Sequence, residues 1–110
     1  MYVWYDRVDP IAKNTRKSRG EKYDDDKARW DLLPIEQIEK VVNVLTFGAE
    51  KYSNDDWKNV DNLRDRYYAA ALRHIVAWRN GEVVDSESGE DHLAHAICCL
   101  LFVMYDNGGK

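Results

Sequence analysis

Cysteine is scarce in this sequence, and long apolar runs are absent from it. The two cysteines, Cys98 and Cys99, are adjacent in a helical pattern. Consecutive side chains on a helix point about 100° apart, which excludes a disulfide between them and gives no zinc site. No apolar run reaches the ~18 residues that cross a bilayer, and the first residues, MYVWYDRV, lack the apolar core of a signal peptide. We therefore expect a cytoplasmic protein with free thiols and no membrane partner.

Several motifs of catalytic and nucleotide-binding proteins are also missing. The sequence has no Walker loop, no GxGxxG, no GxSxG and no Cys–His nucleophile pattern, which argues against covalent catalysis and a dinucleotide cofactor. The formal net charge of −4 argues against binding nucleic acid through a basic surface. A chain of 110 residues with 45% hydrophobic residues forms one domain with a small core. Because helical chains of this size often complete their core by dimerising, we expect a homo-oligomer.

Apolar residues recur at intervals of three and four in three segments, which predicts three amphipathic helices. The first follows Pro34, which suits an initial helical turn, and its stripe extends to Tyr52. The second begins after Asp61, a suitable capping residue, and stops at Gly81. The third runs from about residue 89 to residue 105 and is apolar around most of its circumference, so we expect it to be the most buried. The sequence thus predicts an all-α fold, a small bundle of three main helices with a charged N-terminal arm.

The residues before the first helix are rich in charge and lack apolar periodicity. We assign residues 1–21 to a partly flexible N-terminal arm and residues 22–110 to a single all-α domain. Residues 22–33, KYDDDKARWDLL, mix cations with aromatic residues, a pattern that can hold a phosphate and stack a base. Lys27, Arg29 and Trp30 are therefore candidate substrate-binding residues. Farther along, Trp57 lies in a polar loop, where it either folds back on the core or stacks on a ligand.

All three histidines and five carboxylates lie between positions 73 and 95. Burying an unpaired carboxylate costs several kcal/mol, so these acids are either solvated or share a site with a divalent cation such as Mg²⁺ or Mn²⁺. His92 and His95 share one helical face, where they can ligate a metal, bind a phosphate or act as a general base. His74 faces inward, either as a core histidine or as a ligand-binding residue. Glu36 and Glu39 are also neighbours on one helical face, either solvated or bridged by a cation.

Four blocks of the sequence resemble a family of phage and bacterial proteins described as dATP/dGTP diphosphohydrolases, a small all-α group near the MazG-type pyrophosphohydrolases. The blocks are KYDDDKARWDLLP (22–34), FGAEKYSNDDW (47–57), RYYAAALRH (66–74) and GEVVDSESGEDHLAH (81–95). The resemblance covers roughly residues 20 to 105. It implies a MazG-like fold, a purine nucleotide ligand and the metal-dependent conversion of a nucleoside triphosphate to monophosphate and pyrophosphate. It also implies a location in the cytosol of a bacterium or of a phage-infected host.

The resemblance suggests roles for residues of these blocks and of the first helix. The expected ligands of Mg²⁺ or Mn²⁺ are Glu36, Glu39, Asp85 and Glu87. The expected catalytic residues are Glu82, His92 and His95. The expected substrate-binding residues are Lys27, Arg29, Trp30, Lys51, Tyr52, Trp57, Arg73 and His74.

One feature departs from the MazG-type pattern, in which an ExxE helix and a later ExxD helix hold the metals. Glu36 and Glu39 match the first motif, but the ExxD from Glu82 to Asp85 follows a helix-ending glycine and is predicted to lie in a loop. Histidines stand at the matching place on the third helix. This departure motivates an alternative function, a phage protein that binds and sequesters a nucleotide-derived immune signal without cutting it.

Overall fold

The computed structural model of the protein describes residues 25–108, with side-chain surroundings as far as Asp106. The predicted arm at residues 1–21, with its boundary, lies outside the described residues. The chain divides into two compact units between Leu32 and Leu33, and each unit is described by itself. In the first, the short 3₁₀ helix η3 (Trp30–Leu32) follows Arg29. The Arg29 guanidinium holds both carboxylate oxygens of Asp31, with N–O distances of 2.8 and 2.7 Å.

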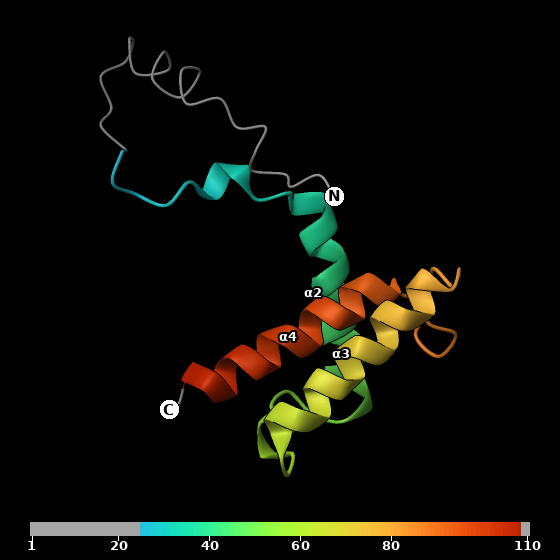
Figure 1. Ribbon diagram of the computed structural model, residues 1–110. Helices are drawn as coiled ribbons and strands as arrows, with labels where there is room; N and C mark the ends of the chain where they lie inside the picture. Colours follow the sequence, from blue (N-terminus) through green and yellow to red (C-terminus); the bar gives the residue numbers. More distant parts are fainter. Residues whose placement is uncertain (1–24, 109–110) are drawn as a thin grey trace. The chain divides into compact units, whose positions relative to one another are not determined.

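The second unit is built from α-helices (Figure 1). They are α2 (Ile35–Lys51), α3 (Leu63–Arg79) and α4 (His92–Gly108), and the short 3₁₀ helix η4 (Asp56–Asn59) lies in the loop between α2 and α3. Helix α4 packs along α3 and against α2. Residues 25–108 contain no strand, and the one β-type pairing within them is an isolated antiparallel bridge between Val84 and Asp91. The prediction of an all-α fold with three main helices is confirmed.

The helix boundaries differ by a few residues from the predicted ones. Helix α4 begins at His92, three residues later than predicted, because Gly89 adopts a φ of 74° and the next residues pair with the loop. The His92 amide donates to the Val83 carbonyl at 2.9 Å, and the Asp85 amide donates to the Glu90 carbonyl at 2.8 Å. The end of α3 agrees with the prediction, since Gly81 follows it with a φ of 105° that side-chain-bearing residues rarely adopt.

Small residues of α4 form the contact with α2. Val41 and Val44 of α2 pack against Ala94 and Cys98 of α4, and the Cys98 thiol donates a 3.4 Å hydrogen bond to the Val41 carbonyl. Short side chains let the two backbones approach closely, which brings a thiol within reach of a main-chain carbonyl on another helix. Many of the buried residues belong to α4, as its pattern predicts, but its larger apolar side chains are partly exposed. They are Leu93, Ile97, Leu100, Leu101 and Met104.

An aromatic cluster joins the loop after α2 to the far half of α4. The Trp57 ring stacks on Phe102, with ring centroids 4.1 Å apart and planes at 11°, and meets the edge of Tyr105 at 4.9 Å. Tyr67 of α3 also contacts Phe102, edge-on, with the two ring centroids 4.9 Å apart. Trp57 therefore folds back on the core, the first of its two predicted alternatives. None of the helices in the described part of the chain is long and apolar enough to cross a membrane.

Candidate functional site

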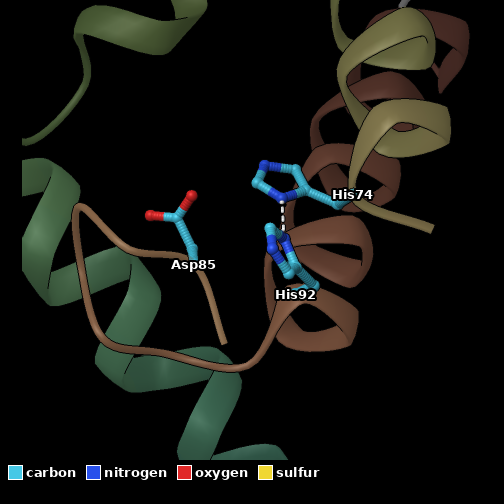
Figure 2. A group of neighbouring side chains, drawn as sticks. All are labelled: His74, Asp85 and His92. Carbon is cyan, nitrogen blue, oxygen red and sulfur yellow. Dashed lines mark hydrogen bonds between the residues drawn. The ribbon is translucent and has the colours of Figure 1, made fainter. Parts of the chain in front are cut away.

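Three histidines and an aspartate converge where α3 ends and α4 begins. His74 lies in the second half of α3, His92 and His95 lie in the first turn of α4, and Asp85 lies in the loop that joins the two helices. Figure 2 shows the rings of His74 and His92 facing each other, with the Asp85 carboxylate beside them on the loop. Because that loop connects α3 directly to α4, His74 and His92, which are 18 positions apart in the sequence, come into contact.

A hydrogen-bonded chain runs from His74 through His92 to Glu82. The Nδ1 atoms of His74 and His92 are 2.8 Å apart, and His92 Nε2 lies 2.7 Å from a carboxylate oxygen of Glu82. His92 is only 4% exposed. A carboxylate can only accept, so Nε2 of His92 carries the proton, and the Nδ1 atom of a neutral His92 is then an acceptor. His74 consequently donates through Nδ1, and Glu82 fixes the orientation of the His92 ring.

A second network holds Asp85, Ser88 and His95. Asp85 Oδ2 accepts from the backbone amides of Glu87 at 3.2 Å and Ser88 at 2.9 Å, and from the Ser88 hydroxyl at 3.2 Å. The Ser88 oxygen accepts from the Glu90 amide at 3.1 Å and lies 2.7 Å from His95 Nε2. When the hydroxyl proton goes to Asp85, His95 donates through Nε2 and keeps the Nδ1 lone pair as an acceptor.

The surroundings of these groups favour neutral imidazoles beside an ionised carboxyl. Burial lowers the pKa of His74, and the neighbouring His95 and His92 lower it further. Burial also lowers the pKa of His95, although Asp85 partly opposes the change. Burial would raise the pKa of Asp85, but the hydrogen bonds from Ser88 and the nearby histidines lower it overall. The His95 ring stacks on His74 with centroids 4.5 Å apart and planes at 10°, which is compatible with two uncharged rings.

A cavity of about 1230 Å³ opens beside this cluster. Its volume exceeds the ~300–1,000 Å³ typical of ligand sites. Seven of the predicted site residues line it: Lys51, Tyr52, Trp57, His74, Asp85, Glu87 and His95. The Lys51 ammonium forms an ion pair with Glu87, which raises the pKa of Lys51. The cavity therefore combines aromatic rings, cations and the histidine–aspartate cluster.

The remaining predicted residues lie elsewhere. Glu82 and His92 are connected by hydrogen bonds to His74, which lines the large cavity. Arg73 lines a smaller cavity of about 380 Å³ on α3. Glu36 and Glu39 are exposed on α2 and are not among the residues that line either cavity, so their metal role stays a prediction. Lys27, Arg29 and Trp30 belong to the first unit, and their substrate role is likewise a prediction.

Arg66, which lines the large cavity, and Ser88 were not predicted as site residues. In sequence, Ser88 and Asp91 resemble a helix-capping pair, but α4 begins four residues after Ser88, which instead connects Asp85 to His95. The available signal was the spacing from Asp85 to Ser88, because an aspartate often accepts from backbone amides two or three residues ahead of it.

Comparison with known proteins identifies the family of the chain. Residues 17–108 match the family described as "dATP/dGTP diphosphohydrolase, N-terminal", and the chain belongs to it. A protein of Salmonella phage PMBT28 named "dATP/dGTP diphosphohydrolase" is 31% identical over 86 residues, which are 78% of this chain. The aligned region spans only 29% of the length of that relative. No solved structure matches the chain.

Proposed function

We propose that this chain binds dATP or dGTP in the large cavity and converts it to the monophosphate and pyrophosphate. The observation that carries the proposal is the position of His95 at the cavity wall, with its Nε2 atom 2.7 Å from the Ser88 oxygen; in the tautomer that donates from Nε2, the Nδ1 atom keeps a lone pair. The membership of the family described as dATP/dGTP diphosphohydrolase, N-terminal, supports the choice of substrate. A lone pair of this kind can accept a proton from a water molecule that attacks a phosphate.

The cavity supplies groups for each part of a nucleotide. Arg66 and Lys51 line it and can neutralise phosphate charge. Tyr52, whose ring is 66% exposed, is available to stack a purine, whereas Trp57 is already stacked on Phe102. We therefore assign base stacking to Tyr52 rather than Trp57.

A divalent cation fits the acidic side of this cavity. Asp85 and Glu87 both line it, and their oxygens are suitable ligands for Mg²⁺ or Mn²⁺. The ion would offset the charge of the triphosphate and polarise the phosphate that water attacks. The chain itself holds Asp85 through the Ser88 amide and hydroxyl, and burial lowers the pKa of His74 and of His95.

Sequestration without hydrolysis is the second candidate function. It is favoured by the exposed positions of Glu36 and Glu39, which are not among the residues lining the large cavity with Asp85 and Glu87. A sponge for a nucleotide-derived signal needs cations and aromatic rings but no activated water. Such a protein would bind its ligand without metal and release it unchanged.

We also propose that the protein forms a homo-oligomer. The exposed residues Leu93, Ile97, Leu100 and Met104 are spaced by four, three and four along α4, which places them on one face with the spacing of a helix-to-helix seam. No large side chain among the described residues is fully buried. A second copy of the chain would cover this stripe and enlarge a small core.

The experiment that tests these functions is incubation of purified protein with each deoxynucleoside triphosphate and with cyclic nucleotide signals. It is run with Mg²⁺, with Mn²⁺ and with EDTA, followed by chromatography of the supernatant and of the heat-released fraction. Metal-dependent pyrophosphate from dATP or dGTP, abolished in His95→Asn, would support hydrolysis. A ligand that is depleted from solution and recovered intact on heating would refute it and establish sequestration. The matched control is Trp78→Leu, a change on α3 outside the residues that line the cavity.

A further inference from the structure

We propose that His74, Asp85 and His92 form a binding site for one divalent transition-metal ion, which shares only Asp85 with the carboxylates expected to hold Mg²⁺. One ligand atom from each residue lies within 4.8 Å of the other two. The proposal concerns metal binding alone and does not rest on hydrolysis. It assigns a role to His74 and the buried His92, which the proposed reaction does not use.

The spacing of the two histidines suits a shared ion. A metal about 2.1 Å from each of two nitrogens places them about 3.0 Å apart at an octahedral angle and about 3.4 Å apart at a tetrahedral angle. The observed separation between the Nδ1 atoms of His74 and His92 is 2.8 Å. A ring rotation that widens the gap by a few tenths of an ångström, with the Nδ1 proton of His74 released to solvent or moved to its Nε2, would allow two metal bonds in place of the hydrogen bond.

Both His92 and Asp85 are held by neighbouring groups in the manner of metal ligands. His92 donates its other ring nitrogen to Glu82 at 2.7 Å, and ligating histidines commonly make this bond to a carboxylate, which fixes the ring and strengthens the ligand. The three hydrogen bonds that Asp85 accepts from residues 87 and 88 all go to Oδ2. They leave Oδ1 with lone pairs that can point at an ion.

The donor set selects the kind of ion. Two imidazole nitrogens and one carboxylate oxygen suit Mn²⁺, Fe²⁺, Co²⁺, Ni²⁺ or Zn²⁺, whereas Mg²⁺ prefers oxygen ligands and keeps several waters. His92 is buried, so an ion there loses part of its hydration. The negative charges of Asp85 and Glu82 offset that cost. The cluster should therefore bind a transition metal in preference to Mg²⁺.

The test uses Co²⁺, whose visible absorption reports its ligands, on protein stripped of metal and on four variants. The unmodified chain should bind one Co²⁺ per chain, and Mg²⁺ at about tenfold excess should not displace it. His74→Asn and His92→Asn should each weaken binding by about 100-fold or more, and Glu82→Gln by about 10–100-fold. Glu50→Gln is the matched control, because it removes an exposed carboxylate of α2 that lies outside the cluster and both cavities and should change the affinity by less than about threefold, well below those losses.

Calorimetry gives the affinity and stoichiometry, and circular dichroism establishes that each variant is folded. If His92→Asn does not fold, His74→Asn carries the test, since His74 is only partly buried. The proposal is overturned if the unmodified chain binds no Co²⁺, if Mg²⁺ displaces it, or if Glu50→Gln weakens binding as much as His74→Asn. Any of these results would leave the two rings as a hydrogen-bonded pair without a metal function.

Discussion

Replacing Trp57 with leucine should destabilise the protein by removing the centre of the aromatic cluster. Trp57 makes two ring contacts, with Phe102 and Tyr105, and each such pair contributes about 0.5–1.5 kcal/mol beyond the buried area. The two pairs together give about 1–3 kcal/mol. Because Trp57 is only partly buried, the total should stay below the ~3–5 kcal/mol seen when a core tryptophan is truncated to alanine. A loss of about 2 kcal/mol corresponds to a fall in Tm of about 8–16 °C in a small domain.

The assay is urea unfolding followed by circular dichroism at several protein concentrations, so that dissociation of an oligomer is separated from unfolding. The control is Trp78→Leu on α3, where the tryptophan is 42% exposed and makes none of the ring contacts found among the described residues. It should cost less than about 1 kcal/mol. Equal losses in the two variants would refute the reasoning. An unchanged free energy of unfolding in Trp57→Leu, combined with lost nucleotide binding, would instead make Trp57 a ligand-stacking residue.

Three further predictions concern α4 and the turn before it. Burial raises the pKa of Cys99 to about 11 and that of Cys98 to about 12. Because less thiolate is then present at pH 8, iodoacetamide should label the native protein about 100-fold or more slowly than the urea-unfolded protein. Similar labelling rates would contradict the burial of these thiols. The double substitution Ile97→Glu and Met104→Glu should shift the protein to monomers in sedimentation experiments, since both side chains belong to the exposed stripe of α4. A monomeric unmodified chain would disprove self-association. Gly81→Ala should cost about 1–2 kcal/mol in urea unfolding because Gly81 has a φ of 105°, and an unchanged midpoint would show that the turn relaxes.

The existence and order of the helices were predictable because their signals are local. Apolar spacing of three and four residues defines a helix wherever its partner lies, and Gly81 ends α3 by its own conformational preference. The start of α4 was not predictable in this way. Ser88 resembles a helix cap in sequence, but the pairing of Val84 with Asp91 extends the loop and delays the helix to His92.

The candidate site was predictable as a segment but not as an arrangement. The concentration of histidines and acids between positions 73 and 95 pointed to the segment whose side chains converge in the structure, and the local spacing of His92 and His95 suggested that they act together. In the structure, His92 instead contacts His74 and Glu82, while His95 contacts Ser88. These partners come from another helix and from a loop, so helical spacing alone cannot pair them.

The sequence by itself determined the all-α class, the three helices and the segment that carries the ionisable residues, because periodicity and composition act over short distances. The tertiary structure decided which of these residues meet. Packing of α4 along α3 turned His74 toward His92 and closed a wall of the large cavity with His95 and Asp85. It also turned Trp57 onto Phe102. Contacts of this kind depend on how helices pack and loops return, and a one-dimensional pattern does not encode those distances directly.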